Sequence, residues 1–165
     1  MTETIIRAYR EADASSVGRL IADTYATYNL DFLAPEARGP FLGPFAHAYS
    51  TDPAHQAAVA QVIRSEIVLV AEQDDEIVGV LRGRKERLAS LFVRGDRQRQ
   101  GIGRKLVEHF EKISRAEGVR VIRVAATLYG IPFYQAMGYK RSTGLRNGWS
   151  FEGHGLPTQP MRKVL

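Results

Sequence analysis

The stretch from residue 66 to residue 126 constrains the fold more than any other part of the sequence. Two β-branched runs, at 67–71 and 77–81, flank a polar turn, which is typical of a hairpin, and a third run follows at 88–93. A loop with two glycines and an amphipathic helix come next, and a buried-type strand occupies 119–126. The chain therefore places a three-stranded meander beside a strand–loop–helix–strand unit.

The flanking segments add secondary structure without adding a second domain. A short strand at 5–9 precedes a helix that is capped by Asp13 or Ser15 and whose apolar face extends to Tyr28, and a second helix starts at Pro53. Between them, three prolines and two glycines at 30–51 predict an irregular, partly helical flap. A short helix at 132–137 precedes a final β-rich section. With 165 residues and no repeat or linker, we expect one mixed α/β domain over residues 1–165.

Composition excludes several kinds of chemistry. The sequence has no cysteine, which excludes disulfides, thiolate metal sites and a cysteine nucleophile, and we expect no metal. The start lacks the basic and apolar pattern of a signal peptide, and the longest aliphatic run, 67–71, is too short to span a bilayer. We therefore expect a cytoplasmic protein without a membrane partner. The net charge of +5 suits a polyanionic ligand.

The loop at 94–103 predicts an anion site. Gly101 and Gly103 lie where a strand passes into a helix, so free backbone amides and the positive end of the helix dipole point at one place. Four basic side chains raise the local potential: Arg97, Arg99, Arg104 and Lys105. The dinucleotide fingerprint needs a third glycine where Leu106 stands, and the spacing of the nucleotide-triphosphate loop is absent.

The segment Gln98-Arg99-Gln100-Gly101-Ile102-Gly103 resembles the pyrophosphate loop of the GCN5-related N-acetyltransferases (GNAT family), Gln/Arg-x-x-Gly-x-Gly/Ala. The run Phe133-Tyr134-Gln135-Ala136-Met137-Gly138-Tyr139 is similar to a second signature of that family. The order of elements agrees over nearly the whole chain. The resemblance implies an α/β (α+β) fold with a central mixed, mostly antiparallel sheet of six or seven strands. Strands 4 and 5 would splay apart, with helices flanking the sheet.

The resemblance also implies acetyl-CoA as the acetyl donor. The end of the fourth strand, Leu91, Phe92 and Val93, would pair with the pantetheine arm like an added strand. The pyrophosphate would bind the amides of Gln98, Arg99, Gln100, Gly101, Ile102, Gly103 and Arg104. Thr127 stands where the family often has Asn, and offers a hydroxyl to the pantetheine amides. Tyr134 would protonate the leaving thiolate, and the amide of Val93 would hold the oxyanion.

The general base is left open. An alkyl ammonium must lose its proton to a carboxylate, a histidine or a water chain before it attacks. By count from Gly101 the family's strand glutamate falls on Arg87, and the adjacent Glu86 is the candidate. The other candidates are His47, His55, Glu66, Glu152 and His154. Without cysteine, the amine attacks directly in a ternary complex.

The acceptor pocket is expected to be aromatic and poor in acids. It would draw on Tyr25, Tyr28, Phe32, Phe41, Phe45, Tyr49, Trp149 and Phe151. We therefore expect a small-molecule or N-terminal amine rather than a polycationic tail, bound by a monomer or homodimer.

Two other functions compete with amine acetylation. Residues 82–105 hold nine Arg+Lys against two acids, a stripe that suits nucleic acid, although helix-turn-helix and aromatic base-stacking signals are missing and we expect no nucleic acid partner. A non-catalytic acyl-CoA sensor of the same fold is the other alternative, because the base is unassigned.

Overall fold

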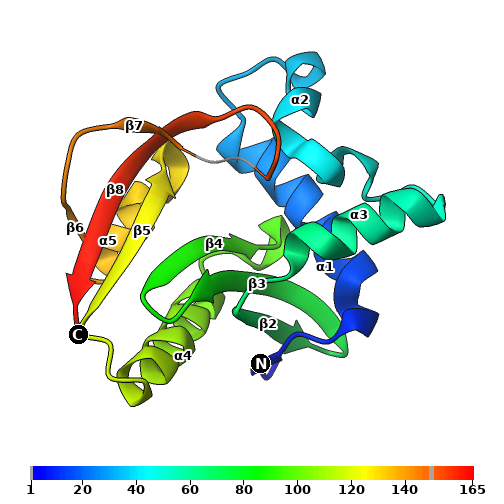
Figure 1. The fold of residues 1–165 in the computed structure, drawn as a ribbon. Helices are drawn as coiled ribbons and strands as arrows, with labels where there is room; N and C mark the ends of the chain where they lie inside the picture. Colours follow the sequence, from blue (N-terminus) through cyan, green and yellow to red (C-terminus); the bar gives the residue numbers. More distant parts are fainter. Residues whose placement is uncertain (1, 149–150) are drawn as a thin grey trace.

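A single twisted sheet organises the molecule, which the computed structural model describes over residues 2–148 and 151–165 (Figure 1). Its strands within this range are β1 (Ile5–Ala8), β2 (Ile67–Gln73), β3 (Glu76–Arg84), β4 (Arg87–Val93), β5 (Val121–Thr127), β6 (Lys140–Arg141), β7 (Arg146–Gly148) and β8 (Leu156–Val164). They follow the order β1-β2-β3-β4-β5-β8-β6, and β7 also pairs with β8. Among the strand pairs of the described residues, only β4 and β5 pair in parallel.

The helices cover both faces of this sheet. The α-helices in the described part of the chain are α1 (Ala14–Thr24), α2 (Gly39–Leu42), α3 (Pro53–Ile63), α4 (Ile102–Ala116) and α5 (Ile131–Ala136). A π-turn, η2 (Tyr25–Asn29), continues α1, and short 3-10 turns are η1 (Glu11–Asp13), η3 (Pro35–Ala37), η4 (Gly43–His47), η5 (Gly95–Arg97) and η6 (Leu128–Gly130). The segment 30–51 is thus irregular and partly helical, as its prolines and glycines predict.

Two apolar cores lie on opposite faces of the sheet. In the first, which we call the α4 core, the apolar stripe of α4, with Leu106 and Phe110 fully buried, packs with α5 residues against β2, β3 and β5. In the second, the α1 core on the other face, α1 and α3 pack over β3 and β4, where Ile21 and Ile63 are fully buried. Figure 1 shows α4 on one side of the meander and α1 with α3 on the other. Successive residues of β3 and β4 therefore feed different cores.

A β-bulge in β4 separates the two halves of the sheet. Arg82 pairs with Ser90 and Gly83 pairs with Leu88, so Ala89 is an extra residue without a partner on β3. Because of this residue, Leu88 and Leu91 both face the α4 core although they are three positions apart. Beyond the bulge β4 leaves β5: the two parallel strands pair at only two described positions, Arg87↔Arg123 and Leu88↔Val124, which join the start of β4 to the middle of β5.

The structure confirms the predicted fold class and the splay between the fourth and fifth strands. Its described residues form eight strands instead of six or seven, because β6 and β7 contain only two and three residues. Such short strands have too little hydrophobic alternation to be recognised in a sequence. No helix among the described residues has the length and apolar character needed to cross a membrane.

An ion pair in the α4 core supports a stability prediction. Glu111 is 3% exposed, accepts from the Tyr139 hydroxyl at 3.0 Å and pairs with Lys163 Nζ at 2.9 Å. The mutation Lys163→Met would leave a buried carboxylate without its cation, and we expect it to lower the free energy of unfolding by about 2–3 kcal/mol. Urea unfolding measures the change, and Lys112→Met, at an exposed position of α4, is the matched control. Equal midpoints for both variants would contradict the prediction.

Candidate functional site

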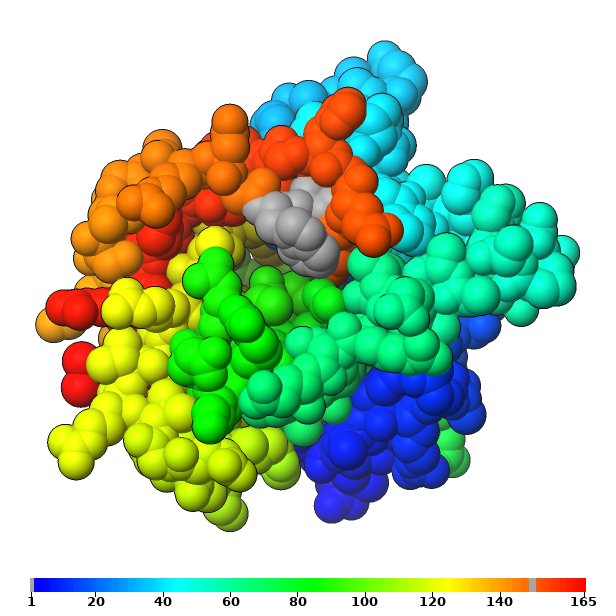
Figure 2. All heavy atoms as spheres, in the orientation of Figure 1, coloured from blue at the N-terminus to red at the C-terminus, as the bar shows by residue number. Residues whose placement is uncertain are grey.

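A cleft of about 1540 Å³ opens where β4 and β5 separate. Its lining includes the second half of β4, most of β5, the loop before α4 and the start of α5. Residues of η2 and β7 also line it. Figure 2 views this face, where the surface is hollowed between the green residues of β3 and β4 and the orange residues around β7. The absence of strand pairing thus leaves a large site in the middle of the sheet.

The end of β4 presents an unpaired backbone edge to this cleft. Arg94 N donates to Val78 O at 2.8 Å, so this pair is a hydrogen-bonded pair of the β3–β4 ladder. Because such pairs alternate along an antiparallel ladder, the amides of Leu91 and Val93 point away from β3. That direction faces the gap between β4 and β5. This edge can accept an extended, amide-containing ligand as though it were another strand.

The loop between β4 and α4 supplies a second set of free amides. Arg99 and Gly101 both adopt positive φ, 61° and 82°, which turns successive backbone amides toward one side. Within the described part of the chain, Lys105 is the first residue of this helix start whose amide finds a backbone carbonyl, donating to Gly101 O at 3.0 Å. The amides from Gln98 to Arg104 remain available to an anion.

Two side-chain contacts fix the loop in place. The side-chain Nε2 of Gln98 donates to Val93 O at 3.0 Å, and its side-chain Oε1 accepts from the Tyr129 hydroxyl at 2.8 Å. These contacts tie the loop to the end of β4 and to η6. A Cβ at Gly103 would lie 3.1 Å from the Phe133 ring, so glycine permits the close packing of α4 on α5. The side chain of Gln98 therefore holds the loop in position, while its backbone amide stays available to an anion.

Tyr134 lies in α5 at the wall of the cleft. Its side chain is 6% exposed and packs edge-to-face against the rings of Phe133 and Tyr139. Burial raises the pKa of its phenol above the usual range. The hydroxyl therefore keeps its proton throughout the neutral range, and it can give that proton only to a strong base formed close to it.

Thr127, at the end of β5, meets a residue that the sequence did not single out. The Asn29 side-chain amide donates to Thr127 Oγ1 at 2.7 Å, and both residues line the cleft. The π-turn η2 places Asn29 there, 98 positions away in the chain. An Asn side chain is thus present next to Thr127, supplied by a different element. No motif surrounds Asn29, so only the tertiary structure reveals this contact.

Among the described residues, no Asp, Glu or His lines the cleft. Glu86 lies in the two-residue turn between β3 and β4, exposed, with its carboxylate 4.0 Å from Arg84. Glu66 accepts from the amide of Lys85, and His47 stacks on His55 with ring centroids 4.0 Å apart. Glu152 and His154 are also exposed. The base role of Glu86 stays a prediction, and the structure does not bring it into the lining of the cleft.

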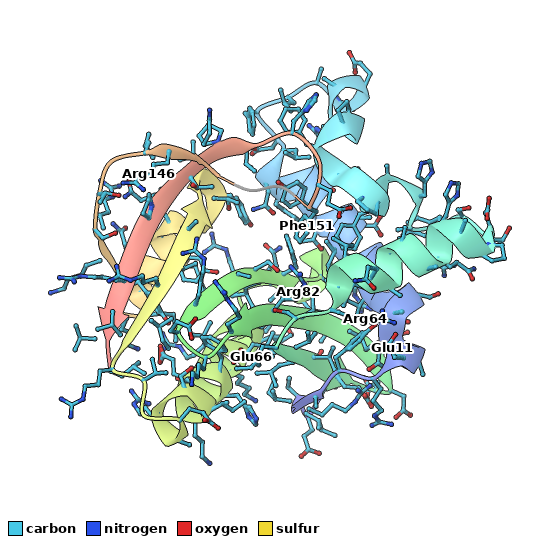
Figure 3. All side chains as sticks on the ribbon, in the orientation of Figure 1. Glu11, Arg64, Glu66, Arg82, Arg146 and Phe151 are labelled. Carbon is cyan, nitrogen blue, oxygen red and sulfur yellow. The ribbon has the colours of Figure 1, made fainter. Side chains whose placement is uncertain are left out.

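The predicted aromatic residues divide among several places. Tyr25 and Phe151 line the cleft and contact one another edge-to-face. Phe45 is buried in the α1 core, while Phe32 and Tyr49 are exposed. Trp149 lies outside the described residues. Arg82 reaches the same region as Phe151, with its guanidinium carbon 5.4 Å from the ring centroid (Figure 3). The predicted aromatic lining is therefore found for only part of the set.

Comparisons with known proteins agree on one family. The family model described as an acetyltransferase (GNAT) domain matches residues 44–165. A GCN5-related N-acetyltransferase from Rhodopseudomonas palustris is similar in structure, with a TM-score of 0.79, 22% identity, and 100% of this chain and 98% of that chain covered. The PaiA N-acetyltransferase from Thermoplasma acidophilum, solved in complex with coenzyme A, has a TM-score of 0.70 and 16% identity, with 99% of each chain covered. Ard1 from Thermoplasma volcanium has a TM-score of 0.66 and 19% identity, with 98% of this chain and 97% of that chain covered.

The loop geometry yields a prediction for coenzyme A binding. In Gly103→Glu, the new side chain would press against Phe133 and place a negative charge among the free amides. We expect calorimetry to show at least a hundredfold weaker binding of coenzyme A, because two effects, each worth about 1.4 kcal/mol or more, act together. Gly144→Glu, where a Cβ meets nothing within 4 Å, adds the same charge elsewhere and is the control. Tight binding retained by Gly103→Glu would show that the pyrophosphate binds elsewhere.

Proposed function

Because the chain belongs to the GNAT acetyltransferase family, whose members are usually acetyl-CoA-dependent enzymes, we propose that it transfers an acetyl group from acetyl-CoA to a primary amine. The observation that carries this proposal is the convergence of two sets of free amides on one cleft. The edge of β4 suits the pantetheine arm, and the amides from Gln98 to Arg104 suit the pyrophosphate. Bound acetyl-CoA supplies an activated thioester.

In this proposal the protein positions and polarises groups instead of forming a covalent intermediate. The amine nitrogen forms a bond to the thioester carbon, and the carbon–sulfur bond breaks. The amide of Val93, directed into the cleft, stabilises the negative charge that develops on the carbonyl oxygen. Tyr134 then donates its proton to the sulfur. The raised pKa of the buried phenol means that this proton stays in place until a thiolate forms nearby.

The proton of the attacking ammonium leaves by another route. Because the described lining of the cleft holds no carboxylate or imidazole, we propose that water carries this proton from the cleft to solvent. Glu86, in the exposed β3–β4 turn, stays the candidate protein base outside the lining of the cleft. The lack of a carboxylate or imidazole in the described lining also favours the alternative of a non-catalytic acyl-CoA sensor.

A crystal structure with coenzyme A, combined with a turnover assay, tests the proposal. We expect the pantetheine arm along Leu91 to Val93 and the pyrophosphate on the loop before α4, with release of free thiol when amines are added. Binding of acetyl-CoA without turnover on a broad panel of amines would favour the sensor. A cofactor found outside the cleft would refute both.

Removing the Tyr134 hydroxyl tests its role as the acid. Tyr134→Phe keeps the ring that packs on Phe133 and Tyr139 and removes only the proton donor. We expect kcat to fall about ten- to a thousandfold with coenzyme A affinity nearly unchanged, the range typical of a lost general acid. Tyr49→Phe, at an exposed tyrosine, is the control. An unchanged kcat in Tyr134→Phe would remove this residue from the mechanism.

A further inference from the structure

Five cationic residues stand directly opposite one another across five adjacent strands of the sheet. The pairs in register are Arg84↔Arg87, Arg87↔Arg123, Arg123↔Arg162 and Arg162↔Lys140. We call these five residues the cationic row. Directly opposed residues of paired strands share one face of the sheet, and all five are exposed. With strands about 4.8 Å apart, the row extends over roughly 19 Å.

The row lies on the face opposite α4. Arg84 follows Arg82 by two positions on β3, so the two side chains share a face. The Arg82 guanidinium donates to Val62 O and Ile63 O, both at 2.8 Å, and these carbonyls belong to α3. The neighbours of the row at Leu88 and Val124 point the other way, into the α4 core. A ligand on the row would therefore approach from the side of α3.

The residues of the row receive little neutralisation from the protein. Among the described residues, Arg84 has an ion pair, with Glu86 at 4.0 Å, and no salt bridge or side-chain hydrogen bond links Arg87, Arg123, Arg162 or Lys140 to an acid. Like charges directly opposite one another destabilise a sheet. Removing the five from the 23 Lys+Arg of the chain leaves 18, equal to the number of Asp+Glu. The excess positive charge of the protein is thus equal to the charge of this row.

The row also reaches the candidate site. Arg84, Arg87 and Arg123 line the cleft, and Arg82 and Arg146 join them there. Figure 3 shows Arg82 and Phe151 next to one another near the centre, with Arg146 of β7 to their upper left. These five arginines come from β3, β4, β5 and β7. They are separate from Arg97, Arg99 and Arg104 of the loop on the coenzyme side.

We propose that the acceptor is an amine that carries a carboxylate or phosphate group of its own, and that the cationic row binds this anion; the inference rests on the proposed acetyltransferase function. The positive field orients such a molecule with its anion on the row and its ammonium directed away from it. The same field favours the neutral amine over the ammonium. An acceptor of this kind would need less help from a protein base, which agrees with the lack of Asp, Glu and His in the described lining of the cleft.

Matched pairs of amines test the proposal. The probes are L-leucine and L-phenylalanine, each against its α-carboxamide, and phosphoethanolamine against ethanolamine; the last pair separates phosphate from carboxylate recognition. Each probe is measured by turnover with acetyl-CoA and by calorimetry on the coenzyme A-loaded protein. We expect the anionic member to bind about tenfold tighter or better in at least one pair, with a KM that rises with salt. The carboxamides have the less basic amines, so this preference would oppose intrinsic reactivity.

The variant Arg87→Gln/Arg123→Gln should reduce this anionic-to-neutral ratio about tenfold while the affinity for coenzyme A persists. Arg115→Gln/Arg120→Gln removes the same charge at two exposed positions outside the cleft and should leave the ratio unchanged.

Anion-selective binding without turnover would refute the proposed function and support the anion site. No preference in any pair, or an unchanged ratio in the cleft variant, would refute the anion site. Duplex DNA binding lost only in the cleft variant, with no amine preference, would assign the row to nucleic acid instead.

Discussion

The structure depends on one interruption of backbone pairing. The extra residue Ala89 in β4 shifts the register against β3, and beyond it β4 and β5 no longer pair. A mixed sheet normally satisfies its interior amides by pairing them, and buried amides left without a partner are costly. Here the amides at the end of β4 face a cleft, where water or a ligand can satisfy them. The splay therefore creates the cleft and leaves backbone donors in it that a ligand with acceptors along its length could use.

The two packed cores keep this opening from closing. The α4 core extends across both halves of the sheet, from β2 and β3 through β5 to α5, and so holds the two halves together on one face. On the other face the α1 core covers β3 and β4, while Phe151 and Leu156 extend it toward β8. The buried contact of Glu111 with Tyr139 and Lys163 links α4 to the C-terminal strand. A rigid frame around unpaired edges is the arrangement that preorganises a binding site.

Local sequence patterns predicted the parts of the molecule that depend on local interactions. The strands at 67–93, the helix after Gly101 and the single domain follow from periodicity and from glycine conformations. The loop before α4 can be predicted as an anion site because its glycines and arginines are adjacent in the chain, and the structure shows positive φ at Arg99 and Gly101 there. Asn29 beside Thr127, in contrast, is a contact between residues 98 positions apart, and nothing local marks it. The acceptor aromatics were predicted as one set, but whether Phe45 enters a core or a cleft depends on tertiary packing.

The cationic row shows the same division between local and tertiary information. In the sequence, Arg84 and Arg87 belong to a basic stripe that extends into the loop before α4, so the sequence alone assigns the whole stripe to one ligand. The sheet divides that stripe: one part stays in the loop before α4, and the other joins Arg123, Arg162 and Lys140 in register. A cation in the acceptor would be repelled from that surface, whereas an anion would be attracted to it. The strand register thus divides the excess positive charge into two separate regions, which the two proposals assign to the coenzyme and to the acceptor.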